Sequence, residues 1–149
     1  MIRIYWADQQ RHLKVNKRNL NVMLRSVLRE MGYGSISLSI ALVDDKQIQQ
    51  LNQQYLNRDE PTDVLAFPLA DSTDAGKENL LGEVVVSTEQ ALSEARRRDY
   101  SPHQELALYC VHGLLHLLGY DDTTVKKRRA MEQKQVEILH RSCKPKVSH

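Results

Sequence analysis

Residues 112–122 read H-G-L-L-H-L-L-G-Y-D-D, and the rest of the chain is organised around this stretch. His112 and His116 are four residues apart in an apolar run, so a helix would place both imidazoles on one face, one turn apart. Two imidazoles at this spacing can hold a single metal ion, as they do in other helical zinc sites. The stretch therefore predicts a helix that carries part of a metal site.

The residues after the second histidine extend this prediction. Gly119 can end the helix in a left-handed cap, because glycine adopts a positive φ without strain. The chain then turns back, and either Asp121 or Asp122 can supply a third ligand. Three protein ligands leave one position open for water, as in catalytic zinc sites. The alternative is a pair of ordinary core histidines, but each buried ring would then need a polar partner.

Length and composition are those of an ordinary globular protein. We expect one domain over residues 1–149, because a chain of this length can bury most of its apolar surface. The first residues become charged too soon for a signal peptide, and no apolar run is long enough to span a membrane. Cys110 and Cys143 form no disulfide framework, so we expect a cytoplasmic protein without a disulfide or a membrane partner.

Local patterns predict four strands and five helices. Alternating or continuous apolar runs predict strands over residues 2–6, 35–43, 64–68 and 80–87. Helical periodicity and capping signals predict helices over residues 16–31, 44–55, 87–98 and 101–118, and from Thr123 or Thr124 to about His140. We expect the strand over residues 35–43 to be buried on one face, and residues 141–149 to fray. The predicted fold is α+β, with a small mixed four-stranded sheet packed with about five helices.

Two charged segments could bind an anion. Arg58 lies among turn residues, and a guanidinium can hold a phosphate through two parallel hydrogen bonds, although it could instead pair with Asp59 or Glu60. Residues 126–149 contain eight Lys and Arg residues against two acids. Such a basic end is either a solvated helix face or a surface for a polyanion.

A metalloprotease is the first metal enzyme to consider for two histidines at this spacing. In that class a glutamate directly follows the first histidine and acts as the base. Gly113 occupies this position and has no side chain, so the helix does not supply the base.

Three motifs in the same order resemble the YbeY family, a family of metal-dependent endoribonucleases of ribosomal RNA maturation. Residues 112–122 resemble the family signature H-G-x-L-H-L-x-G-Y-D-H. Residues 61–68, P-T-D-V-L-A-F-P, resemble its P-T-D-V-L-S-F-P, and residues 81–87, L-G-E-V-V-V-S, resemble its L-G-D-I-x-I-S. Order and spacing agree over roughly residues 36–140. The resemblance implies an α+β fold with the metal site at one end of a cleft.

The resemblance also implies roles for individual residues. His112 and His116 match the first two of three histidines that hold zinc in the family, and Asp122 stands where the third would be. Either Asp122 binds as a carboxylate, or the site holds a different divalent metal or holds its metal loosely. Arg58 matches the family's functionally important arginine near the metal. We expect Arg58, His112 and His116 to be catalytic, and the RNA backbone to be bound by Arg58, Lys126, Lys127 and Arg128.

The function implied by the resemblance is cleavage of single-stranded RNA. We expect an endoribonuclease that matures the 3′ end of small-subunit ribosomal RNA and serves ribosome quality control, together with the ribosome and maturation factors. Two alternatives remain open. One is a metal-dependent hydrolase of another substrate such as peptide. The other is an RNA- or ribosome-binding factor whose catalysis is weakened by Asp122.

Overall fold

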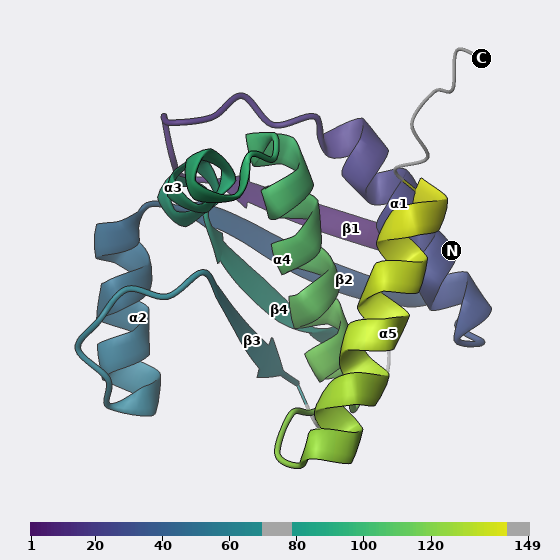
Figure 1. Ribbon diagram of the computed structural model, residues 1–149. Coiled ribbons are helices and arrows are strands. Elements are labelled where there is room, and N and C mark those ends of the chain that lie inside the picture. The colour runs from purple at the N-terminus through teal and green to yellow at the C-terminus, as the bar shows by residue number, and fades with distance from the viewer. Residues whose placement is uncertain (70–78, 143–149) are drawn as a thin grey trace.

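The computed structural model describes residues 1–69 and 79–142, which form a four-stranded sheet and five helices (Figure 1). The strands are β1 (Ile2–Asp8), β2 (Ile36–Val43), β3 (Val64–Pro68) and β4 (Leu80–Ser87). The helices are α1 (Lys17–Glu30), α2 (Asp45–Leu56), α3 (Thr88–Arg98), α4 (Pro102–Leu117) and α5 (Val125–Ser142). The predicted α+β fold with a mixed sheet is confirmed.

The sheet has the strand order β1-β2-β4-β3. The β1–β2 and β2–β4 pairs are parallel, and β3 joins β4 antiparallel at the edge of the sheet. A large core lies between one face and helices α1, α4 and α5, while α2 covers part of the opposite face through a smaller cluster around Ile48 (Figure 1). Helix α4 packs directly on β3 and β4, which places the predicted histidines beside the edge strand.

Strand β2 is more buried than its alternating sequence predicts. Ser37, Ser39 and Ala41 alternate with the core residues and belong to the face expected to be exposed, yet Ser37 and Ala41 are only 2% and 8% exposed and Ser39 is partly buried. The prediction of one solvated face is wrong for these positions. The strand lies between β1 and β4, and near its end the α2 cluster covers the second face.

Capping residues place the helix starts as the sequence predicts. Asp44 and Gln47 make both bonds of a capping box at α2, with N···O distances of 2.8 and 3.1 Å. Ser101 and Gln104 do the same at α4, where Pro102 occupies the first position. Helix α4 ends at Leu117, and Gly119, two residues on, has the positive φ of 98° expected for the predicted left-handed cap.

Ser87 and Gln90, which have the spacing of a capping box, form only one half of it at the start of α3. The Ser87 hydroxyl accepts the Gln90 amide N–H at 3.2 Å. The Gln90 side chain does not return to Ser87, because it donates to the Asp45 carboxylate at 3.1 and 3.2 Å. Since Asp45 also accepts the Ser87 hydroxyl at 2.7 Å, the start of α3 is tied to the start of α2.

Helix α5 continues further than predicted and is clamped to α1. Arg141 is helical and donates to Glu30 Oε2 at 2.6 Å, while Lys134 donates to Glu30 Oε1 at 2.8 Å. The helix therefore extends two residues beyond the predicted end near His140. Residues 143–149, which include Cys143, lie outside the described residues.

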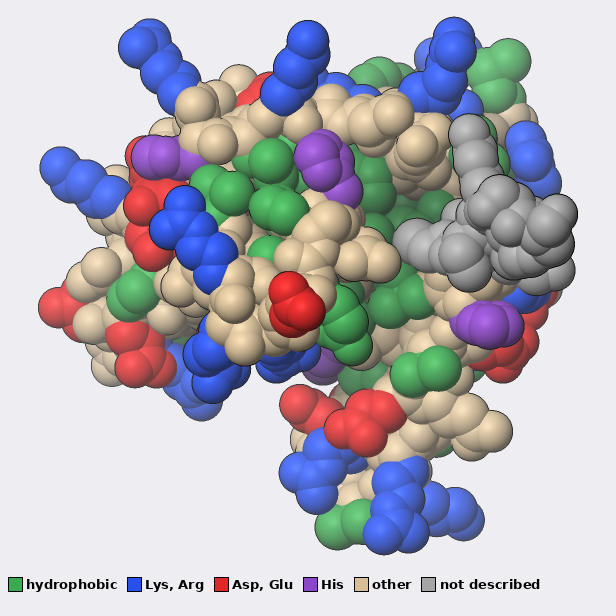
Figure 2. All heavy atoms as spheres, turned by 45° about the horizontal axis from the view of Figure 1, so that its top comes forward, with side chains coloured by type: hydrophobic (Ala, Val, Ile, Leu, Met, Phe, Trp, Pro, Cys, Tyr) green, Lys and Arg blue, Asp and Glu red, His purple; other side chains and the backbone are tan. Residues whose placement is uncertain are grey.

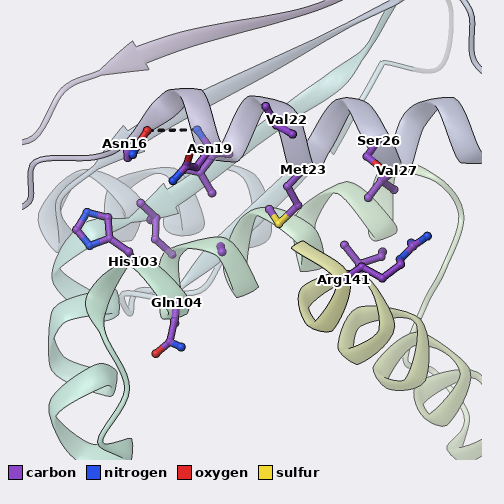
Figure 3. Close-up of a pocket in the computed structure, with 13 residues that line it drawn as sticks. Asn16, Asn19, Val22, Met23, Ser26, Val27, His103, Gln104 and Arg141 are labelled. Carbon is purple, nitrogen blue, oxygen red and sulfur yellow. Dashed lines mark hydrogen bonds between the residues drawn. The ribbon is translucent and has the colours of Figure 1, made fainter. Parts of the chain in front are cut away.

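A groove of about 790 Å³ lies between α1, α4 and α5 beside this clamp. Figure 3 shows Met23 and Val27 of α1 facing Arg141 of α5 across it, with Asn16 at the start of α1. The groove contains none of the predicted site residues. Among the described residues, no helix combines the length and the apolar character needed to cross a membrane.

Candidate metal centre and its surroundings

Gly113 sets the position of the two histidines by letting α4 lie directly on the sheet. A Cβ atom on Gly113 would lie 2.5 Å from Val84 Cγ1 and 3.1 Å from Val64 Cγ2. Neither distance leaves room for a larger side chain. The position that carries the base in metalloproteases therefore faces the packed core here and cannot hold a glutamate.

His112 and His116 face each other on the partly buried side of α4. Their Nε2 atoms are 3.2 Å apart, and the His112 Nδ1 atom lies 3.0 Å from Oε1 of Gln135 on α5. Two ligands of a tetrahedral zinc ion with bonds of 2.0–2.1 Å are about 3.3 Å apart. The two imidazoles therefore fit neighbouring positions of one metal ion.

The protonation of His116 also suits a metal ligand. Burial lowers the pKa of His116, and the neighbouring His112 lowers it further. Asp122 and Asp121 act in the opposite direction, but the net change is downward. His116 is therefore more readily neutral, and the neutral imidazole is the form that binds a metal.

A pocket of about 700 Å³ brings four of the predicted site residues together. Arg58, His112, His116 and Asp122 all line it, together with the segment that enters β3. Asp121 is not among the lining residues. Its carboxylate instead accepts the Thr123 amide at 3.1 Å and the Thr123 hydroxyl at 2.7 Å, so Asp121 holds the turn between α4 and α5.

Arg58 reaches this pocket because α2 ends in a left-handed residue, Asn57, with φ of 57°. Within the described residues, the Arg58 guanidinium makes no ion pair and no hydrogen bond. Asp59 accepts a hydrogen bond from Gln49 Nε2 at 3.0 Å instead. Arg58 therefore does not pair with Asp59 or Glu60 in the structure.

The basic residues predicted to bind RNA lie at the start of α5. Lys126, Lys127 and Arg128 are exposed and line none of the pocket, although Asp122 shortly precedes them. Lys127 Nζ lies 3.6 Å from Asp121 Oδ2. On the face seen in Figure 2, most Lys and Arg side chains stand towards the edge of the molecule, and an acidic side chain lies near the centre.

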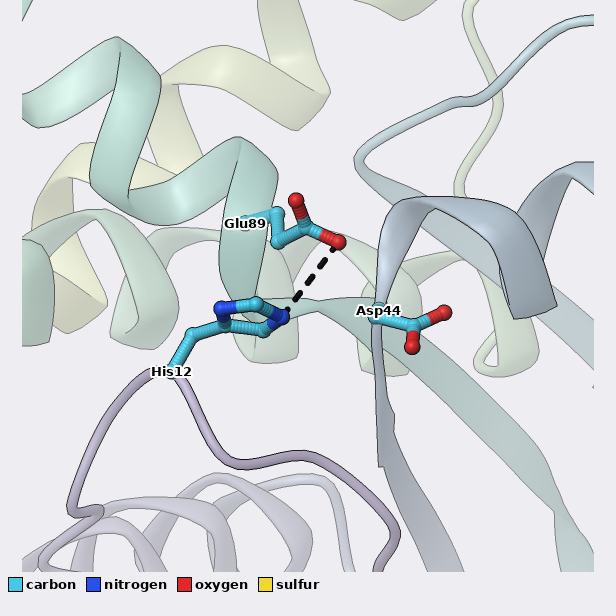
Figure 4. A group of neighbouring side chains, drawn as sticks. All are labelled: His12, Asp44 and Glu89. Carbon is cyan, nitrogen blue, oxygen red and sulfur yellow. Dashed lines mark ion pairs between the residues drawn. The ribbon is translucent and has the colours of Figure 1, made fainter.

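A second cluster, which the sequence did not reveal, could hold a metal ion. His12, Asp44 and Glu89 come from three separate segments and have ligand atoms within 4.8 Å of one another (Figure 4). His12 Nε2 is 3.5 Å from Glu89 Oε1. Both carboxylates also cap helix α2, since Asp44 accepts the Gln47 amide and Glu89 accepts the Asp45 amide. No local motif announces this cluster, because only the fold brings the segments together.

The predicted metal ligands are less closely gathered than this cluster. Within the part of the chain that the structure describes, the ligand atoms of His112, His116 and Asp122 do not all lie within 4.8 Å of one another. The two imidazoles are close to each other, so the residue that stands apart is Asp122, which is exposed. The structure therefore contains a two-histidine site with a carboxylate on the wall of the same pocket.

Comparisons with known proteins cover nearly the whole chain. A family model described as Endoribonuclease YbeY matches residues 5–142. A Carboxydothermus hydrogenoformans protein named endoribonuclease YbeY is 42% identical over 136 residues, which are 89% of this chain and 92% of that protein. A Syntrophotalea carbinolica protein of the same name is 36% identical over 141 residues, with 93% and 94% covered. The solution structure of TM1509 from Thermotoga maritima has a TM-score of 0.63 at 28% identity, and covers 97% of this chain and 90% of that one.

Proposed function

The chain belongs to the YbeY endoribonuclease family, and on this premise we propose that it is a metal-dependent endoribonuclease that cleaves single-stranded RNA. The family resemblance predicted from the three motifs is thereby confirmed. The observation that carries the proposal is one pocket that contains two facing imidazoles and a guanidinium with no partner within residues 1–69 and 79–142. We further propose that residues 1–149 form one catalytic domain that works in the cytoplasm with the ribosome on the maturation of small-subunit ribosomal RNA.

His112, His116 and Asp122 are the proposed holders of one zinc ion. The two imidazoles fit, because their Nε2 atoms have the spacing of neighbouring zinc ligands, and Asp122 lines the same pocket as a carboxylate that has not closed on them. When bound, such an ion lowers the pKa of a water molecule and polarises a phosphate oxygen. A carboxylate in place of a third imidazole also makes the site more suitable for harder divalent metals such as manganese.

Arg58 is the proposed binder of the scissile phosphate. Its guanidinium has no partner among the described residues, so it can form two parallel hydrogen bonds to phosphate oxygens. Because charge grows on the phosphoryl group during cleavage, a fixed cation at this place stabilises the transition state more than the bound substrate.

The start of α5 supports RNA as the substrate. Its first turn contains no acidic residue, and Lys126, Lys127 and Arg128 follow one another there. The amino end of a helix carries a partial positive charge, so these cations lower helix stability where acids would raise it. Together they form a positive surface next to Asp122 that suits the backbone of a nucleic acid.

Asp122→His tests the metal site. We expect it to raise zinc content and RNA cleavage, because a third imidazole completes the set, and we expect Asp122→Ala to lower both. The measurement is elemental analysis of the purified proteins, with cleavage of a labelled single-stranded RNA. If Asp122→His raised neither quantity, Asp122 would not be a ligand.

Arg58→Ala tests the phosphate site. Loss of one transition-state donor lowers kcat by about 10²- to 10³-fold in comparable sites, whereas Arg96→Ala on α3 should leave cleavage unchanged. Arg58→Lys should recover only part of the activity, because lysine keeps the charge but loses the bidentate geometry. Equal cleavage by Arg58→Ala and wild type would remove Arg58 from the mechanism.

A binding factor without nuclease activity is the second candidate. The exposed Asp122, which does not close on the two imidazoles, favours it. This candidate predicts RNA binding without cleavage at saturating zinc or manganese, and no loss of function in His116→Ala. A peptide substrate is disfavoured, since Gly113 leaves no room for the metalloprotease base.

A further inference from the structure

We propose that Gln135 is a positioning residue that fixes the tautomer of His112, so that the His112 Nε2 atom is free to bind a metal. The inference rests on the proposed function, which it deepens by adding a residue from α5 to a site otherwise built from α4 and the turn after it. The carrying observation is the 3.0 Å contact between His112 Nδ1 and Gln135 Oε1.

The place of Gln135 on its helix is unusual for an amide. Met131 and Ile138 lie four residues before it and three residues after it, and they are 2% and 1% exposed. Residues at these spacings share one face of a helix, so Gln135 belongs to the stripe by which α5 packs on the body of the protein. Gln135 itself is only partly buried, and its amide oxygen has His112 as a polar partner.

The chemistry of imidazole makes this contact directional. A neutral imidazole carries its proton on one ring nitrogen and a lone pair on the other. An amide oxygen can only accept, so the bond to Gln135 Oε1 places the proton on His112 Nδ1. The lone pair then lies on Nε2, the atom that faces His116 Nε2 at 3.2 Å. In the other tautomer, an N–H group would occupy the space between the two rings and block a metal.

Helix α5 is held firmly enough to act as a support. Lys134, the residue before Gln135, is bound to Glu30 of α1 at 2.8 Å, and Ile138 is buried in the main core. Partners of this kind, which orient a metal-binding histidine through its second nitrogen, change metal affinity by about 10- to 100-fold when removed.

Three variants at position 135 and one control test the inference. Gln135→Met keeps the length of the side chain but loses the oxygen that accepts the hydrogen bond from His112 Nδ1–H. Gln135→Glu keeps an oxygen acceptor, and Gln135→Lys can only donate. Gln133→Met makes the first change at an exposed position of the same helix. The readouts are zinc affinity by chelator competition and the His112 tautomer by ¹⁵N NMR of the metal-free protein.

We expect Gln135→Met and Gln135→Lys to bind zinc about 10- to 100-fold more weakly, and Gln135→Glu and Gln133→Met to stay near the wild-type affinity. We also expect the Nδ1–H tautomer in wild type and a mixture in Gln135→Met. The inference is overturned if Gln135→Met binds zinc like wild type, or if Gln135→Glu weakens binding as much. A wild type that neither binds zinc nor cuts RNA would defeat the proposed function, and the tautomer measurement would still decide the role of Gln135.

Discussion

Gly113 lies against Val64 of β3 and Val84 of β4, between two histidines that must keep their spacing from each other. Glycine weakens a helix interior by about 1 kcal/mol relative to alanine, so its presence needs a reason. The reason is steric, since Val84 and Val64 occupy the space that a Cβ atom would need. Gly113 thus explains both the close packing of α4 on the sheet and the absence of the metalloprotease base.

We expect Gly113→Ala to destabilise the protein although alanine favours helices. Overpacking a core costs about 1–3 kcal/mol, and valine side chains on a strand have little freedom to move aside. Gly34→Ala is the matched control, because a Cβ there meets nothing within 4 Å. Urea denaturation should show a lower free energy of unfolding for Gly113→Ala only. A stabilised Gly113→Ala protein would contradict the steric explanation.

His116 should make the stability of the metal-free protein depend on pH. Its pKa is lowered in the folded state, chiefly by burial and then by His112, below the ordinary value of 6.5. The unfolded chain therefore binds a proton more readily, so stability is present above pH 6.5 and is lost as pH falls through the folded pKa.

His116→Gln should flatten this part of the pH dependence, and the exposed His103→Gln should not. Thermal unfolding in the presence of a chelator, from pH 7.5 to 5, measures both. An unchanged slope in His116→Gln would show that another group titrates in this range.

At the scale of the element, the basic first turn of α5 disfavours the helix and forms the surface that we propose for RNA binding. We expect Lys126→Glu with Arg128→Glu to stabilise the protein, because acids at the amino end of a helix gain about 0.3–1 kcal/mol each. The same variant should bind single-stranded RNA more weakly. Its salt dependence should fall by about 0.7 in log–log slope for each lost phosphate contact.

Arg96→Glu is the control for this comparison, because it should change stability in the opposite direction. Arg96 lies in the last turn of α3, where a cation is favourable, so the change should lower stability and leave RNA binding intact. Equal loss of RNA affinity in both variants would point to net charge and not to the α5 surface.

The helices and strands could be predicted largely because their signals are local. The capping box of Asp44 and Gln47, and the Gly119 cap, need only neighbouring residues. The burial of Ala41 could not be predicted, since it depends on which strands flank β2 and on α2 covering the sheet. From the sequence alone Gln135 looks like a solvated helix residue, and its contact with His112 depends on how α5 packs on α4. The pocket residues could be predicted from the motifs, whereas the contacts that support them depend on how the helices and strands pack.

At the scale of the whole molecule, Glu30 joins the first helix to the last. Hydrogen bonds from Lys134 and then from Arg141 lower the pKa of Glu30 below its ordinary value near 4.5. This contribution to stability is present above pH 4.5 and is lost as pH falls through the folded pKa. Because these ion pairs are at the surface, salt should also weaken them.

We expect Glu30→Gln to lower the melting temperature at pH 7 and to reduce the loss of stability on acidification. Glu132→Gln, an exposed change on α5, should do neither. Scanning calorimetry from pH 7 to 3.5 checks both. A Glu30→Gln protein with the acid sensitivity of wild type would mean that the clamp does not contribute.

The register of the sheet has a consequence for the order in which the protein assembles. Strand β4 pairs with β3 close by in sequence, Gly82 opposite Pro68, whereas β2 must find Glu83 from Ser39 and Ile2 from Ile36. Short-range pairs close at lower entropic cost and therefore sooner. Helix α4 packs on Val64 and Val84, so we expect it to dock after β3 and β4 have paired. Gln135 contacts His112 of α4, so we expect α5 to dock after α4. We expect the pocket to form after the folding barrier is crossed, so that a bound ion slows unfolding and leaves the folding rate unchanged.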